Sequence, residues 1–348
     1  MVSVRPSLIG FVLAASSCPS SGCSERQPAV EKTKYSRVIS EFEQPLCQGD
    51  RSLIDERIER TAERLGLQPE IIEIELYTSP PVPGCSSPFG CYSGGVARTI
   101  ASSLEHEIVH AIAAPIGANR KLWSEGLAEA LSGGFIRRSW RRDSTVSTEW
   151  EAKTSGELDY LLAGHLAQWL IASRGMEAFL RAYRGESTED VYGLPLEALG
   201  EEYEREAPWG YSSEGCLEEA VSLVTDEHEE TFEIDCATNG VRHLVGLYPG
   251  SVASSKNLGI ERAGRYELRL EGGLAVQVLR CLDPVVSTEE PDLEGGVYHD
   301  ADLSPPNPYL FADGAHELEL DASVHRFTVY GTDELDEDSV RLILRRLK

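Results

Sequence analysis

Two short stretches decide how this chain is interpreted: His106-Glu107-Ile108-Val109-His110, and Trp123-Ser124-Glu125-Gly126-Leu127-Ala128-Glu129-Ala130-Leu131 further along. Residues four apart on an α-helix lie on one face, about one turn apart, so two imidazoles at this spacing can direct ring nitrogens at one ion. The glutamate beside the first histidine is offset from that face. This suits a carboxylate that holds a metal-activated water without binding the metal. The first stretch therefore predicts a metal-binding helix.

The second stretch contains acidic residues at helical spacing, and a catalytic zinc site needs a third ligand. A catalytic zinc ion keeps three protein ligands and one open position, and Glu125 and Glu129 lie one turn apart on the expected second helix. The alternative for the first stretch is an amphipathic helix with two exposed histidines. For the second it is a solvated helix face, because helices often carry glutamates at this spacing.

Together the two stretches resemble the gluzincin metallopeptidases, in which a second helix carries W-x-x-E-G-x-A or S-E-G-L-A-E and its first glutamate completes the zinc site. Transferred position by position, the resemblance implies Zn²⁺ held by His106, His110 and Glu125, with Glu107 as general base. It also implies that Glu129 braces a ligand histidine from behind.

The resemblance extends over roughly residues 100–210. It includes the stretch 160–171, the Arg174-Gly175 pair after it and the segment from Val191 to Trp209. The sequence departs from the aminopeptidases of this clan in three ways: the interval from His110 to Glu125 is shorter, one residue rather than two separates the tryptophan from the glutamate, and no GxMEN motif is present. The resemblance is thus to the broad clan, and aminopeptidase activity does not follow from it.

Hydrolysis of a peptide bond also needs a donor for the developing oxyanion. Tyr160 and His165, on the next expected helix, are the candidates, and the alternative for each is a packing or surface residue. The histidines without ligand spacing are interpreted as structural: His228, His243, His299, His316 and His325. No GxSxG elbow, phosphate-binding GxxxxGK[ST] or CxxC pair occurs in the sequence.

Charge excludes some classes of partner. The chain of 348 residues carries 58 acidic and 32 basic side chains, a formal net charge of −26. Such a surface repels phosphate backbones and anionic head groups, so we expect neither nucleic-acid binding nor electrostatic docking on a membrane. The expected partner is a peptide or protein substrate, and the oligomeric state is left open.

The first residues are typical of an export signal. Arg5 precedes the apolar run 8–15, which is much shorter than the roughly 20 residues of a membrane-spanning helix. We therefore predict a signal peptide over 1–23, a polar tether over 24–34, and a protein that is secreted or held in a bacterial cell envelope. Small residues before Cys18 resemble a lipoprotein processing site, so lipidation at Cys18 and simple secretion are alternatives.

The cysteines beyond the leader suggest disulfides, as is usual for an exported chain. Cys85 and Cys91 flank a Gly/Pro/Ser loop and form the simplest local pair. Cys236 and Cys281 lie in strand-like segments and are a candidate pair across a sheet. Cys47 and Cys216 complete the set of six.

The pattern of apolar residues predicts an α+β protein. Strands are expected over 35–42, 71–77 and 96–100, and helices over 51–65 (with Asp50 as N-cap), 102–114, 123–131, 157–173 and 176–184. Beyond Trp209, short alternating segments such as 265–270, 276–279, 316–320 and 341–344 are typical of an antiparallel β-sandwich. We therefore expect a zincin-like catalytic domain over 35–210 and a β-sandwich-like domain over 211–348.

The sequence thus favours a zinc-dependent peptidase. Two alternatives from other classes are a zinc-binding or adhesion-type envelope protein without turnover, and a structural lipoprotein whose histidine motif is accidental.

Overall fold

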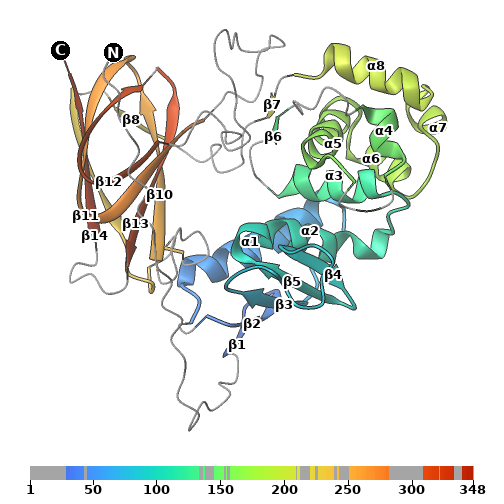
Figure 1. Ribbon diagram of the computed structural model, residues 1–348, viewed down its shortest axis with the longest axis horizontal. Helices are drawn as coiled ribbons and strands as arrows, with labels where there is room; N and C mark the ends of the chain where they lie inside the picture. Colours follow the sequence, from blue (N-terminus) through green and yellow to red (C-terminus); the bar gives the residue numbers. More distant parts are fainter. Residues whose placement is uncertain are drawn as a thin grey trace, which may run out of the picture.

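A computed structural model provides the coordinates and confirms an α+β protein. It describes residues 29–42, 45–132, 136–137, 145–152, 154, 157–208, 210–211, 220–223, 226–238, 241–242, 251–281, 309–320, 322–332 and 339–347. The expected signal peptide, Cys18 and Cys216 lie outside these residues. The described apolar side chains form two main clusters, one within 38–207 and one that, apart from Cys47, lies within 223–344. The second cluster belongs to the β-rich group of strands seen beside the helices in Figure 1.

A five-stranded sheet begins the first part. Its order is β1 (Ala29–Lys32), β2 (Ser36–Ser40), β3 (Ile72–Tyr77), β5 (Val96–Ile100) and β4 (Gly90–Ser93). The three central strands are parallel, and both edge strands run antiparallel to their neighbours. The predicted strands over 35–42, 71–77 and 96–100 are confirmed. Two edge strands were missed, because β1 falls in the expected tether and β4 in an expected loop.

Helix α1 (Gln48–Arg64) connects β2 to β3 and covers the sheet with the buried Ile54, Ile58 and Ala62. The prediction of Asp50 as its N-cap is wrong, because the helix begins three residues earlier and Cys47 is the N-cap. Asp50 instead accepts a hydrogen bond at 3.1 Å from the backbone N–H of Cys47. The carboxylate still caps the first turn, but from inside the helix.

The helical region carries the motifs. It contains η1 (Ala101–Ser103), α2 (Leu104–Ala113), η2 (Ala114–Ile116), α3 (Lys121–Leu131), α4 (Val146–Trp150), α5 (Tyr160–Arg174), α6 (Met176–Tyr183), α7 (Thr188–Tyr192) and α8 (Leu196–Glu206). The four helices predicted in this region are present. Helix α5 begins later than expected, because the Asp159 side chain accepts hydrogen bonds from the N–H groups of Leu161 and Leu162 and caps it.

Helices α3 and α5 approach each other closely through two glycines. A Cβ atom at Gly126 would lie 2.6 Å from the carbonyl oxygen of Ala163, and one at Gly164 would lie 2.6 Å from Cβ of Glu129. Any side chain at either position would push the helices apart. This close contact sets the position of α3 relative to α5, and with it the positions of Glu125 and Glu129.

Two short strands end the first part of the chain. Strand β6 (Ile136–Arg137) pairs with β7 (Gly210–Tyr211). Tyr211 also packs against the first cluster, one residue beyond the end expected for the first domain.

The second part is one sheet of seven described strands: β8 (Val221–Leu223), β9 (Glu227–Glu233), β10 (Ser251–Ile260), β11 (Gly264–Arg280), β12 (Tyr309–Leu320), β13 (Val324–Thr332) and β14 (Ser339–Arg346). All pairings are antiparallel except that of β8 with β10. The segments 265–270 and 276–279, expected as two strands, are one strand, β11, with a register shift between Leu270 and Ala275. Its first half pairs with β14 and its second with β13, so the described strands of this part form one hydrogen-bonded sheet, which carries most of the second cluster.

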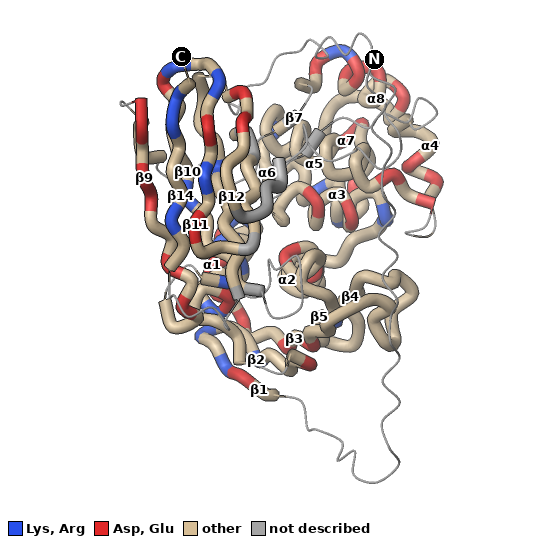
Figure 2. The backbone as a smooth tube through the Cα atoms, turned by 60° about the vertical axis from the view of Figure 1, so that its left-hand side comes forward, with Lys and Arg blue, Asp and Glu red and all other residues tan. Residues whose placement is uncertain are grey.

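Charged side chains pair across the outer strands of this sheet. Arg341 on β14 forms ion pairs with Glu229 on β9 and Glu271 on β11, and Figure 2 shows basic segments of β14 beside the acidic β9. Much of the charge here is therefore neutralised locally.

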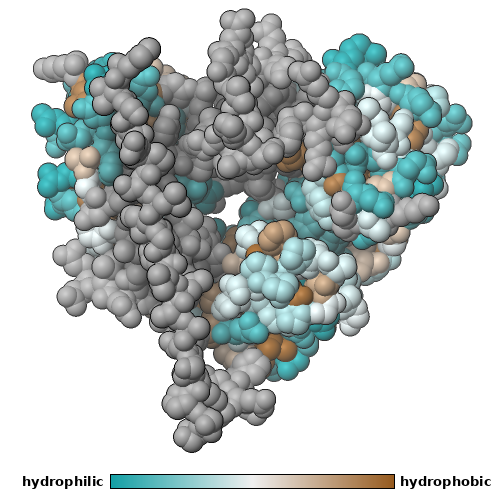
Figure 3. Space-filling view, in the orientation of Figure 1, coloured by the Kyte–Doolittle hydropathy of each residue, from teal (hydrophilic) through white to brown (hydrophobic). Residues whose placement is uncertain are grey.

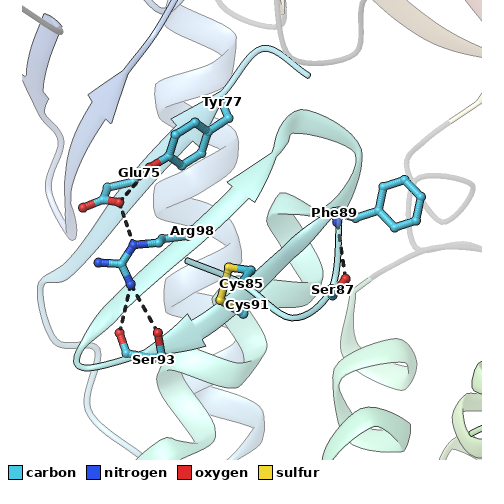
Figure 4. The surroundings of a disulfide bond; sticks show 8 residues. All are labelled: Glu75, Tyr77, Cys85, Ser87, Phe89, Cys91, Ser93 and Arg98. Carbon is cyan, nitrogen blue, oxygen red and sulfur yellow. Dashed lines mark hydrogen bonds and ion pairs between the residues drawn. A yellow bond between two sulfur atoms is a disulfide. The ribbon is translucent and has the colours of Figure 1, made fainter. Parts of the chain in front are cut away.

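The cysteines join the chain in two ways. The predicted Cys85–Cys91 disulfide is confirmed, and it closes the loop before β4 (Figure 4). The candidate pairing of Cys236 with Cys281 is wrong, because Cys236 is bonded to Cys47 and Cys281 belongs to another disulfide. The Cys47 bond fixes the start of α1 to the second part, and the N–H of Gln48 donates to the carbonyl of Cys236 at 2.9 Å.

Large apolar side chains that are exposed occur singly. Val30, Ile71, Phe89 and Val221 are the large apolar residues most open to solvent among those described, and Figure 3 shows brown residues scattered among hydrophilic ones. Within the described part of the chain, no helix has the length and apolar character needed to cross a bilayer.

Candidate metal centre

Three side chains from two helices converge on one point. The Nε2 atoms of His106 and His110, both on α2, lie 3.0 Å apart. Oε2 of Glu125, on α3, is 3.2 Å from the first nitrogen and 3.0 Å from the second. Within the described residues, this is the group of histidine and acidic side chains whose ligand atoms are close enough to share an ion.

The size of this triangle matches a small divalent cation. Three ligands placed about 2.0–2.1 Å from a tetrahedral zinc ion are separated from one another by about 3.3 Å, only slightly more than the distances seen here. The group can therefore hold a metal ion.

The orientation of His106 supports the same conclusion. Its Nδ1 lies 2.9 Å from Oε1 of Glu129. A carboxylate at that distance favours a proton on Nδ1, which leaves a lone pair on Nε2 facing the centre of the triangle. Glu129 thus lies where the sequence placed it, behind a candidate ligand.

His110 has an outer contact that the sequence did not reveal. Its Nδ1 lies 3.5 Å from Oγ of Ser124, which also interacts with the hydroxyl of Tyr183. The signal available in the sequence was weak: Ser124 is simply the neighbour of the candidate ligand Glu125.

Glu107 is buried beside the cluster and interacts electrostatically with His106, His110 and Glu125. It is 5 % exposed, and no described residue forms a hydrogen bond with its Oε2. Burial raises the pKa of this carboxyl, against the lowering effect of the two histidines. A buried oxygen without a protein partner is a natural place for a water molecule.

Strand β4 packs directly on Glu107. A Cβ atom at Gly90 would lie 3.0 Å from Oε1 of Glu107 and 2.8 Å from the carbonyl oxygen of Arg98. Only glycine fits between the two. The Cys85–Cys91 disulfide lies in the same segment and closes the loop that leads into β4.

The protonation of the other groups reflects their mutual contacts. Burial raises the pKa of Glu125, but hydrogen bonds with His106 and His110 outweigh it and hold that pKa well below its usual range. Burial lowers the pKa of His106, yet its contacts with Glu125 and Glu129 raise it to about 10.

The two candidate oxyanion donors differ in position. The ring of Tyr160, at the start of α5, has its centroid 6.1 Å from that of His106, so Tyr160 lies at the site. His165 is fully buried, with Nδ1 2.9 Å from the hydroxyl of Tyr203 and its ring 5.2 Å from that of Tyr211. A side chain without solvent exposure does not reach a substrate, so the catalytic interpretation of His165 is replaced by a packing role.

No known protein-family model matches the chain, and a comparison with curated proteins finds no match.

Proposed function

We propose that this protein is a zinc-dependent peptidase of the gluzincin type, with a zincin-like catalytic part within residues 35–210. The observation that carries the proposal is the convergence of His106, His110 and Glu125 at 3.0–3.2 Å, beside a buried carboxylate with one oxygen free of described partners. Two histidines and one glutamate form a common zinc ligand set for hydrolysis.

Zinc bound by these three residues would acidify a water molecule and polarise the scissile carbonyl. Glu107 would accept the proton of the attacking water and deliver it to the leaving amine. The hydroxyl of Tyr160 would donate a hydrogen bond to the developing oxyanion.

Strand β4 supports a peptide as the substrate. It is the last strand of its sheet, and the N–H of Ile100 donates to the carbonyl of Phe89. Since hydrogen-bonded positions alternate in an antiparallel pair, the backbone groups of Gly90 and Tyr92 face away from β5. An extended peptide can add to such an edge, beside Glu107.

We also propose that the protein is exported. The disulfides Cys47–Cys236 and Cys85–Cys91 support this, because such bonds persist in oxidising compartments.

The decisive experiment combines metal analysis with cleavage of a broad peptide library. Glu107→Gln should lower kcat by about 10²–10⁴-fold and leave zinc stoichiometry unchanged. Glu105→Gln is the matched control, because Glu105 lies on the same helix and pairs with Arg57 at 2.8 Å instead.

Full activity of Glu107→Gln would exclude it as the base. A wild-type protein that binds zinc but cleaves no peptide would favour the non-catalytic zinc-binding alternative. Protein purified without stoichiometric metal would favour an accidental motif.

A further inference from the structure

The two oxygens of Glu125 have different partners. Oε2 faces both histidines, whereas Oε1 lies 3.2 Å from Nζ of Lys121. Lys121 is the first residue of α3, one turn before Glu125, and its side chain is 44 % exposed against 6 % for Glu125. The ammonium group therefore lies at the solvent side of the candidate metal centre.

The different partners of the two Glu125 oxygens affect how this carboxylate binds an ion. A carboxylate can bind a metal through one oxygen or through both. Binding through both would use a coordination position that a hydrolytic site must leave open for water. A cation at Oε1 withdraws charge from that oxygen and holds it away from the centre.

We propose that Lys121 is a positioning residue that keeps Glu125 bound to the metal through Oε2 alone. The inference rests on the proposed metal site and adds a residue that the ligand motif does not contain. Lys121 does not touch the metal or the substrate in this role, and it acts through Glu125.

Helix stability does not account for a lysine at this position. A pair with lysine four residues before glutamate is the less favourable orientation on a helix. A positive charge in the first turn also opposes the helix dipole. The contact with the candidate ligand Glu125 instead explains why a lysine is favourable at this position.

The test compares Lys121→Met and Lys121→Arg in protein loaded with cobalt(II) in place of zinc. Cobalt(II) absorbs visible light strongly when four-coordinate and more weakly when five-coordinate. Lys121→Met should weaken the absorption band and lower kcat by about tenfold, in the range typical for residues behind metal ligands. Lys121→Arg should restore both, since it keeps a cation at Oε1.

Lys34→Met is the control, because Lys34 is exposed and pairs with Glu59 on α1, not with a residue of the candidate metal centre. A Lys121→Met protein with the wild-type spectrum and kcat would overturn the proposal. So would a change confined to KM, which would instead place Lys121 in contact with substrate. Failure of the wild-type protein to bind cobalt would overturn the metal site itself. Cobalt binding without peptide cleavage would count against the peptidase alone, and the spectra would still decide the role of Lys121.

Discussion

Histidines in the two parts of the molecule have different surroundings. In the second part, His228 contacts Glu230 at 3.1 Å and His325 contacts Ser323 at 3.1 Å, in each case a residue two positions away. Residues two apart on a strand share a face, so contacts of this kind stay within one segment of the chain. On α2, the histidines are stacked one turn apart, and α3 brings a carboxylate across to both. The packing of α2 against α3, more than residue type, gives these histidines the arrangement of a candidate metal centre.

The sharpest way to test this comparison is to remove one histidine from each part. His110→Ala should lose stoichiometric metal and all peptide cleavage, because two remaining ligands do not hold zinc in a hydrolytic site. His325→Ala, on β13 of the second part, should keep both. Elemental analysis and a cleavage assay measure the outcome. Retention of metal by His110→Ala would contradict the assigned ligand set.

Removal of the two disulfides, one at a time, should have an effect of intermediate size. The Cys47–Cys236 bond spans 189 residues and the Cys85–Cys91 bond spans 6. A crosslink stabilises more when it closes a longer loop, so Cys47→Ser with Cys236→Ser should lower the free energy of unfolding by about 2–4 kcal/mol. Catalysis should persist below the unfolding transition, as denaturant titration and cleavage at low temperature would show.

Cys85→Ser with Cys91→Ser is the matched variant. It should have the smaller effect on stability, because it closes the shorter loop, and the larger effect on kcat, because it lies in the segment that contacts Glu107 through Gly90. The reverse ranking would mean that the covalent link between the two parts, and not the local one, supports the site.

The smallest expected effect concerns Glu129. Glu129→Gln removes the charge behind His106 and keeps the volume, so zinc affinity should fall about 10–100-fold. Competition with a chelator measures it. Glu204→Gln, on the remote helix α8, serves as the control. An unchanged affinity would show that the 2.9 Å contact does not orient the imidazole.

Part of the site was predictable from helix geometry, and the resemblance to gluzincins supplied Glu125 and Glu129. The four-residue spacing of His106 and His110 sets their common face, and the glutamates of α3 keep the same period. Strands β2, β3 and β5 followed from alternation, and Cys85–Cys91 from closeness in sequence. None of these features requires knowledge of distant parts of the chain.

Packing between distant segments decided the rest. The alternation of apolar and polar residues did not reveal that β11 continues through its register shift. The polar composition of residues 29–32 did not reveal that they pair with β2. Spacing did not distinguish Tyr160, which lies at the site, from His165, which is buried against Tyr203.

The sequence by itself determined the chemical groups and their local periodicity, because backbone geometry repeats over a few residues. Only the tertiary structure decided which groups meet: Glu125 with the histidines, Gly90 with Glu107, and Cys47 with Cys236. Those contacts depend on how helices and strands pack over long sequence separations, where no local period applies.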